Sequence, residues 1–258
     1  IKPDPFDELE NDSTPVHGLA ALENKLRNAQ NGEPNQTNKP KFEGYFPDWT
    51  NEPPDVPPLL TLNGLSVLTA GNVSTLIAQT GSGKSHVCES ILATAINPTA
   101  PNLGICAQIQ AGEKCIYFDT ERPKKETWKG WARSMYRAGY RRGHPPPESL
   151  IYANLIDPPP DERREIIETL VCVHKPKLVV IDGVIDLLPN GDFNSIAESF
   201  ETVGWLVRLA NQNDLGILAT IHSNPTDPDL KAKGHAGVKL MEKSEFVLGL
   251  QKFADGTR

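Results

Sequence analysis

The sequence is poor in the features that mark secreted, membrane-spanning and disulfide-stapled proteins. None of its apolar runs approaches the roughly 18 residues that a membrane-spanning helix needs, and the N-terminal residues show no signal-peptide pattern. It has only 4 cysteines, with no C-x-x-C pair and no histidine at ligand spacing. These absences argue against a transmembrane helix, a secretory signal and a cysteine–histidine zinc site. They favour a cytoplasmic protein with reduced thiols.

The net charge of −7 lies almost entirely in the first 60 residues. They hold 5 Lys/Arg and 11 Asp/Glu, whereas residues 61–258 carry only −1. Ten of the 23 prolines also lie there, with few β-branched or aromatic residues, a composition that does not build a packed core. We therefore expect residues 1–58 to form an extended, partly disordered arm with a short helix at 19–29, and residues 59–258 to form the folded domain. Because the chain begins at Ile1 rather than Met, we expect it to be cut from a longer protein.

The most informative segment is 78–85, Ala-Gln-Thr-Gly-Ser-Gly-Lys-Ser, which matches the phosphate-binding pattern G-x-x-x-x-G-K-[ST] except for Ala78 at the first position. An apolar run precedes it and a helical pattern follows, the setting in which this motif works. Gly81 and Gly83 let backbone N–H groups turn inward around phosphate oxygens. We expect Lys84 to reach the β- and γ-phosphates and Ser85 to bind Mg²⁺. The predicted ATP-binding residues are Ala78, Gln79, Thr80, Gly81, Ser82, Gly83, Lys84, Ser85 and His86.

Six apolar runs separated by helical patterns follow residue 60, which is typical of a parallel sheet covered by helices. The runs are residues 73–78, 114–119, 150–155, 178–182, 215–222 and 244–252. Residues 161–174 and 195–212 show apolar side chains at helical spacing, with Asp161 and Ser195 as expected N-caps. The predicted fold is α/β, with a mostly parallel sheet flanked by helices and an extended N-terminal arm.

Two carboxylates at strand ends are candidate catalytic groups, because open α/β sheets bind their ligands at the carboxyl ends of strands. Asp182 ends the run Leu-Val-Val-Ile-Asp, where its carboxylate can hold a water molecule bound to the Mg²⁺. The alternative is an ordinary strand-end Asp that starts a turn before Gly183. Glu121 can polarise the water that attacks the γ-phosphate. Asp119 is its rival for that role, and either acid could instead cap the next helix.

His222 is the third candidate, because it ends the run 215–222 and a Ser-Asn-Pro turn follows it. A polar side chain at this place can contact the γ-phosphate and transmit the nucleotide state to the next loop. The alternative is a surface histidine at a strand end. The chain order of these residues is therefore as informative as their types.

The motifs, in that order, resemble those of the RecA-fold ATPases. They are the phosphate loop, Phe118-Asp119-Thr120-Glu121, Val180-Ile181-Asp182-Gly183, Ile221-His222-Ser223-Asn224-Pro225 and Lys233-Gly234-His235-Ala236-Gly237. Within that fold they are similar to the hexameric replicative helicases of plasmids and mobile elements, including the plasmid RepA type. The resemblance covers about residues 60–258.

The resemblance implies roles for individual residues. Glu121 matches the catalytic glutamate, Asp182 the metal-binding acid and His222 the polar switch residue, acting beside the phosphate-binding Lys84. Lys252 matches a basic residue that reaches the nucleotide of a neighbouring subunit. The family usually has a second basic residue nearby, and here only Arg258 is available.

The resemblance also implies two loops, 189–194 and 226–237, that face DNA in the centre of a ring. The first has no basic residue and contains Asp192, which disfavours contact with phosphates. DNA binding is therefore expected from the second loop. Its candidate residues are Lys231, Lys233 and His235.

A basic stretch at 122–144 stands apart from the resemblance, with eight Lys or Arg and a single acid, Glu126. The pattern predicts a cationic stripe on one helix face, recurring every four residues: Lys125, Lys129, Arg133 and Arg137. Other side chains are expected to point into the core: Trp128, Trp131, Met135 and Gly139. The stripe could bind the phosphates of a single strand, dock on the acidic arm or on an adjacent subunit, or be a solvated helix face.

The function expected is that of an ATP-hydrolysing, helicase-type motor on single-stranded DNA in a replication system. A ring of identical subunits is expected because the phosphoryl transition state gains from a cation supplied in trans, and the sequence shows no convincing arginine finger in cis. One alternative is a RecA-fold ATPase that acts as a recombination mediator or regulator without unwinding. Another is a nucleotide-binding module that does not hydrolyse ATP; the fold alone does not decide among them.

Overall fold

The structure is a computed structural model in which residues 49–224 and 231–252 are described. The predicted arm, its helix at 19–29 and the domain boundary at 58/59 rest mainly on residues outside this range, so they stay predictions. The described residues from Asp55 onward belong to one compact unit, which holds all the helices and strands that follow. Among the described residues, no helix is both long and apolar enough to cross a membrane.

A six-stranded sheet forms the centre of this unit, and all the strand pairs described in it are parallel. The strands are β3 (Val73–Ala78), β5 (Cys115–Asp119), β6 (Leu150–Asn154), β7 (Leu178–Asp182), β8 (Gly216–His222) and β9 (Val247–Leu250), in the spatial order β6-β5-β7-β8-β3-β9. Strands β3, β5 and β7 are buried along their whole length, which explains why they are continuous apolar runs. The predicted parallel sheet is confirmed, with each predicted run containing one of these strands.

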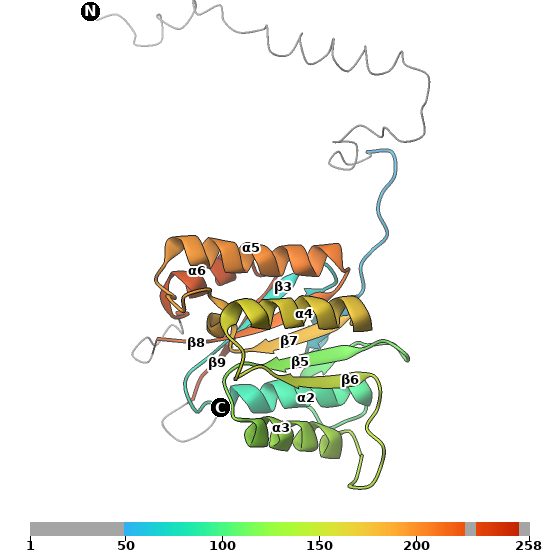
Figure 1. The fold of residues 1–258 in the computed structure, drawn as a ribbon. Coiled ribbons are helices and arrows are strands. Elements are labelled where there is room, and N and C mark those ends of the chain that lie inside the picture. Colours follow the sequence, from blue (N-terminus) through green and yellow to red (C-terminus); the bar gives the residue numbers. More distant parts are fainter. Residues whose placement is uncertain (1–48, 225–230, 253–258) are drawn as a thin grey trace, which may run out of the picture. The chain divides into compact units, whose positions relative to one another are not determined.

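Helices cover both faces of the sheet (Figure 1). One face is covered by α2 (Lys84–Ile96) and α3 (Lys124–Arg137), and the other by α4 (Pro160–His174), α5 (Ile196–Gln212) and α6 (Gly234–Lys243). A short 3-10 helix, η2 (Val184–Leu187), follows β7. Each face has its own apolar core, one containing Ile91 of α2 and the other Leu206 of α5. The predicted α/β fold is confirmed.

The predicted N-cap of α5 is confirmed, whereas that of α4 is wrong. The Ser195 hydroxyl accepts a hydrogen bond from the Glu198 N–H at 3.3 Å. Helix α4 begins one residue earlier than predicted, at Pro160, with Pro159 as its N-cap. Proline is well suited to the first helical position because its fixed φ is already helical. Asp161 therefore lies in the first turn, where its charge interacts favourably with the helix dipole.

A second, smaller sheet was not predicted. It is antiparallel and contains β1 (Pro58–Leu62), β2 (Leu65–Thr69) and β4 (Ile105–Ala107) in the order β2-β1-β4. Its hairpin turn is Asn63-Gly64, with φ of 48° and 84°, and Asn-Gly is the preferred pair for a two-residue turn with positive φ at both positions. Its buried side chains, such as Leu60 and Leu68, pack in the same core as α2.

The register of the parallel strands sets the position of the predicted site residues. Asp119 at the end of β5 is paired with Asp182 at the end of β7, and Asp182 is paired with Thr220 of β8. His222 extends two residues further and is paired with Ala78 at the end of β3. Polar side chains from three strands, β5, β7 and β8, therefore meet at one edge of the sheet, beside the phosphate loop.

The two sheets meet closely at Gly216, which gives a test of the packing. A Cβ at Gly216 would lie 2.8 Å from Leu59 Cδ1 and 2.9 Å from Leu68 Cγ. We expect Gly216→Ala to lower the free energy of unfolding by about 1–3 kcal/mol, because the core must shift to accept it. The control is Gly204→Ala in α5, whose Cβ would approach only the flexible end of Arg208 at 3.3 Å. That change should stabilise the helix by roughly 0.5–1 kcal/mol; equal urea-unfolding midpoints for the two variants would contradict the packing argument.

Candidate active site

The predicted phosphate loop connects β3 to α2. Gly81 and Gly83 both have left-handed backbone conformations, with φ of 74° and 96°, which glycine adopts at little cost. Among the described residues no side chain caps α2, so its first N–H groups remain available to an anion. Ala78 is still part of β3, buried and paired with both β8 and β9. An extended residue needs no glycine, which explains why the motif tolerates alanine here.

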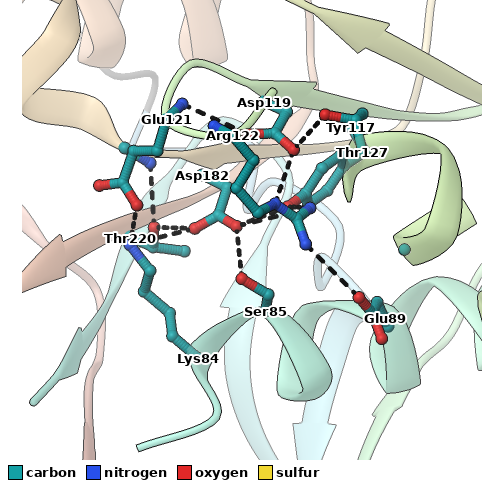
Figure 2. A network of polar contacts seen from close by, with 12 residues as sticks. Lys84, Ser85, Glu89, Tyr117, Asp119, Glu121, Arg122, Thr127, Asp182 and Thr220 are labelled. Atoms are coloured by element: carbon teal, nitrogen blue, oxygen red, sulfur yellow. Dashed lines mark hydrogen bonds and ion pairs between the residues drawn. The ribbon is translucent and has the colours of Figure 1, made fainter. Parts of the chain in front are cut away.

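Lys84 joins the two candidate carboxylates. Its Nζ lies 2.9 Å from Glu121 Oε2 and 3.2 Å from Asp182 Oδ1, as Figure 2 shows. Burial alone would lower the pKa of Lys84, but the charges of Asp182 and Glu121 outweigh it and hold the pKa above its ordinary value. The amine is therefore charged, and the structure brings together three of the predicted site residues.

Asp182 is almost fully buried and its oxygens are well occupied. Oδ2 accepts hydrogen bonds from the hydroxyls of Ser85 at 3.1 Å and Tyr117 at 2.5 Å, and Oδ1 accepts one from Thr220 at 2.8 Å. Burial alone would raise the pKa of Asp182, but Lys84 and the two hydroxyls of Tyr117 and Thr220 outweigh it and lower the pKa. The side chain is therefore an ionised carboxylate.

The predicted metal-binding pair fits Mg²⁺ by the chemistry of its donors. The Ser85 hydroxyl and the Asp182 carboxylate are both oxygen ligands and already lie within hydrogen-bond distance of each other. Mg²⁺ prefers such ligands and is commonly held by one or two protein groups together with substrate phosphates and water. Ser85 and Asp182 are thus the residues that would hold it.

Glu121 and His222 form the outer part of the site. His222 Nε2 lies 3.4 Å from Glu121 Oε1. Burial raises the pKa of Glu121, but contacts with His222 and Lys84 outweigh it, and the net effect is a lowered pKa. Among the described residues, the buried atoms His222 Nδ1, Ser223 Oγ and Ser82 Oγ make no hydrogen bond. Such atoms are uncommon in folded proteins, and here they fit a site that a polar ligand completes.

Asp119, the rival of Glu121, has a different environment. Its side chain is fully buried, and its Oδ2 accepts hydrogen bonds from Arg122 Nε and the Thr127 hydroxyl, each at 2.7 Å. Its Oδ1 accepts the backbone N–H groups of Glu121 at 3.3 Å and Arg122 at 3.0 Å. Burial outweighs these contacts and raises the pKa of Asp119. Asp119 thus shapes the turn that carries Glu121.

Arg122 is the main residue that sequence reasoning missed. Its NH2 group donates to the Tyr117 hydroxyl at 2.7 Å, its Nε donates to Asp119, and its NH1 lies 3.6 Å from Glu89 Oε1 (Figure 2). Glu89 is fully buried in α2 and also accepts two hydrogen bonds from Arg133, at 2.6 and 2.7 Å. In the sequence Arg122 is one of many basic residues, and Glu89 follows no motif. Of the residues missed in this network, only Tyr117 had a signal in the sequence, because it lies two residues before Asp119 in the same strand.

The residues of the predicted cationic stripe all lie on α3, and they differ in what they contact. Arg133 is bound to Glu89, Lys129 pairs with Glu126 at 2.6 Å, and Arg137 lines a cavity beside the phosphate loop. Trp128, predicted to enter the core, is half exposed. Gly139 lies beyond the end of the helix, with φ of 95°. The periodicity was real, but the buried acid of α2 takes one of its members.

A cavity of about 510 Å³ adjoins the phosphate loop. The loop side is formed by Ser82, Gly83 and the start of α2, and the other side is largely apolar: Leu62, Leu103, Ile105, Leu248 and Leu250. The predicted residue His86 lies at its edge and contacts Glu89 Oε2 at 3.1 Å. An apolar cavity beside a phosphate cradle suits a nucleoside attached to the phosphates.

Lys252 lies beside the phosphate loop of its own chain. Its backbone N–H donates to the side chain of Gln79 at 3.2 Å, and the Gln79 N–H donates to the Leu250 carbonyl at 3.4 Å. The end of β9 is thus fixed to the first loop residue. The role of Lys252 toward the nucleotide of a neighbouring subunit stays a prediction.

The predicted DNA-binding loops meet at the start of α6. Lys233 Nζ lies 4.3 Å from the centre of the Phe193 ring, and the Ala236 N–H donates to the Phe193 carbonyl at 3.1 Å. Lys231 and His235 are exposed, while residues 225–230 lie outside the described range. The structure therefore brings segments 189–194 and 231–237 together. His222 connects them to the nucleotide site, because its carbonyl accepts the Lys233 N–H.

The ion network predicts a large effect of removing Arg122. Arg122→Gln leaves the buried Asp119 without its cationic partner and Glu89 with Arg133 alone, so we expect a loss of about 3–5 kcal/mol in the free energy of unfolding. The matched control is Lys125→Gln, an exposed position on α3 that should change stability by at most about 0.5 kcal/mol. Urea unfolding measures both. Similar values for the two variants would mean that the network contributes little stability.

The lowered pKa of Glu121 predicts a pH dependence. A carboxyl whose folded pKa lies below its ordinary value of 4.5 contributes stability that is present above that value and lost as pH falls through the lowered pKa. The stability of the parent protein relative to Glu121→Gln should therefore decrease as the pH is lowered from about 6 to about 3. Urea unfolding at several pH values measures this difference. A difference that stays constant would contradict the assigned ion pair.

Comparison with known protein families agrees with this site. A family model described as an AAA domain matches residues 39–227, more than half of the chain. A search among curated proteins found no match. The matched segment contains the phosphate loop, both candidate carboxylates and the whole of β8, and the parallel sheet fits a RecA-like ATPase. The chain therefore belongs to the AAA-domain family of P-loop ATPases.

Proposed function

We propose that the chain is an ATP-hydrolysing motor that acts on single-stranded DNA, resembling the replicative helicases of the plasmid RepA type. The observation that carries the proposal is the position of His222. Its side chain contacts Glu121 in the nucleotide site, and its backbone is bonded to the segment with the candidate DNA-binding residues. A motor needs such a link between the state of its bound nucleotide and its binding of DNA.

Lys84 changes partners when ATP binds, in our proposal. Its amine is neutralised by Glu121 and Asp182. The γ-phosphate competes for the same amine because it carries more negative charge. Mg²⁺, which Ser85 and Asp182 would hold, would supply further neutralisation of the phosphate charge. Lys84 then binds phosphate, and Glu121 is released to act on water.

Glu121 is the proposed base rather than Asp119. The Glu121 side chain is 29 % exposed, so water can reach it, and its partners are Lys84 and His222. Asp119 is fully buried and bound to Arg122 and Thr127. A general base must reach the proton it removes, which supports Glu121.

The proposed coupling to DNA runs through the backbone after β8. The Lys233 N–H donates to the His222 carbonyl at 3.1 Å, and Ser223 and Ala232 form an antiparallel bridge. Displacement of His222 by the γ-phosphate would therefore move the residues that start α6. Lys231, Lys233 and His235 are the proposed DNA contacts.

A ring of identical subunits completes the proposal. Within the described residues, Arg122 is the arginine nearest the metal-binding acid, 4.0 Å from Asp182 Oδ2, but it is bound to Asp119 and Tyr117. A cation for the transition state is therefore best supplied by a neighbouring subunit. Lys252 is the proposed candidate.

The test is ATP hydrolysis with and without single-stranded DNA, in low salt and at several protein concentrations. We expect DNA to raise the rate, because the loop and His222 are coupled. Lys84→Ala should lose nucleotide binding, whereas Glu121→Gln should bind ATP and lose about 10²–10⁴-fold in turnover. His222→Ala should keep basal hydrolysis better than it keeps DNA stimulation. Parental turnover by Glu121→Gln would show that the base is assigned wrongly, and an unstimulated parent protein would overturn the motor.

A RecA-fold ATPase that mediates recombination or regulates without unwinding is the second candidate. The observation that favours it is the composition of segment 189–194, which has no basic residue and contains Asp192. Strand separation on a forked duplex distinguishes the two. DNA-stimulated hydrolysis without strand separation would support the second candidate.

A further inference from the structure

Helix α3 and the turn that follows it form a second concave surface, away from the nucleotide site. It encloses about 180 Å³, and its walls include aromatic and arginine side chains: Trp128, Trp131, Tyr136, Tyr140, Arg141 and Arg142. We name it the α3 groove. It lies on the helical layer opposite α6, so it is separate from the segments proposed above to contact DNA (Figure 1).

The aromatic walls of the α3 groove divide into buried and exposed parts. Trp131 packs against the core and against Tyr152, at 6.3 Å between ring centres. Trp128 and Tyr136, eight residues apart on the same helical face, are 50 % and 43 % exposed. Neither of these two rings is part of the apolar core. Neighbouring exposed aromatic side chains mark an interaction surface.

Arginines form the rim of the groove. The Arg142 guanidinium lies 5.8 Å from the centre of the Trp128 ring, within the range of a cation–π contact. Arg141 donates to the Tyr140 carbonyl at 2.9 Å. In the described part of the chain neither guanidinium pairs with a carboxylate, and no acid lines the groove. A guanidinium has five N–H donors, so both can still bind an anion.

The groove is fixed in place by the ion network beneath it. Arg133 on α3 binds the buried Glu89 of α2, and Thr127 at the start of α3 binds Asp119. These contacts fix α3 to β5 and α2. A surface that is already ordered loses less entropy when it binds.

We propose that the α3 groove binds single-stranded nucleic acid. A base stacks against the exposed ring of Trp128 or Tyr136, and flanking phosphates contact Arg141 and Arg142. Single-strand binding surfaces combine these two elements, because every base has a stacking face and every linkage has a charge. A proline-rich peptide would also fit aromatic walls, but the cationic rim without acids favours a polyanion. The groove gives the proposed motor a second contact with its strand, outside the α6 segments.

The test measures binding of a fluorescein-labelled oligothymidylate of about 15 nucleotides by anisotropy, without nucleotide. We expect Trp128→Ala to weaken binding at least about fivefold, since one stacked base is lost. Trp128→Phe should retain most of the affinity. Arg142→Gln should reduce the slope of log affinity against log salt by about 0.7, the value for one phosphate contact on a single strand. Circular dichroism and thermal unfolding check that each variant is folded.

Matched controls separate the groove from the rest of the chain. Trp49→Ala removes an almost fully exposed tryptophan outside the groove, and Arg208→Gln removes an exposed charge on α5. Neither should change binding more than slightly. Groove variants that bind as the parent does, or that bind no worse than these controls, overturn the proposal.

A parallel experiment with a peptide tests the alternative occupant of the groove. If an acidic, proline-rich peptide quenches the fluorescence of Trp128 and the oligonucleotide does not, the groove is a peptide site and our inference is wrong. Basal ATP hydrolysis of the groove variants should equal that of the parent. Because binding is measured without ATP, loss of the groove effect and absence of a DNA-stimulated ATPase are distinct results.

Discussion

Asp182 ends a strand in the middle of the sheet, and its side chain is only 1 % exposed. A carboxylate so buried is tolerated when its oxygens are hydrogen-bonded and its charge is balanced. Its four partners come from three places in the chain: Lys84 and Ser85 at the start of α2, Tyr117 in β5 and Thr220 in β8. Removing any one of them leaves this charge less balanced. The position of the phosphate loop against the sheet therefore depends on this one acid.

A second layer of charge extends the same constraint to α3. Arg122 links the Tyr117 hydroxyl to Asp119 and Glu89, and Arg133 then fixes α3 to α2 through Glu89. Each buried acid in this series has a cationic partner, which is the condition under which buried charges are stable. As a consequence, the basic residues that face inward bind the buried acids, and only basic residues outside this network are available to bind a partner.

The fold could be predicted from the sequence, and so could the proximity of Lys84, Glu121 and Asp182, because both depend on local patterns. Buried parallel strands are continuous apolar runs, and the loop after β3 needs glycines and a lysine at fixed spacing. The hairpin at Asn63-Gly64 also had a local signal and was overlooked. The arginine network had no such signal, because Arg122 and Arg133 meet Glu89 only after α2 and α3 pack on the same face. Spacing along a helix places a side chain on a face, but it does not say what lies opposite.

The contacts of Lys84 give the proposed order of events a physical basis. Lys84 balances Glu121 and Asp182, so in this proposal ATP would exchange one set of ionic contacts for another. The free energy of phosphate binding is reduced by the contacts that Lys84 gives up. That exchange also lowers the positive charge beside Glu121, which makes its carboxylate a stronger base at the moment when the phosphate is in place. Because His222 contacts the same carboxylate, we propose that the change reaches the end of β8 in the same step. In this proposal, nucleotide binding, activation of the base and a signal to the α6 segment would follow from one rearrangement of charge.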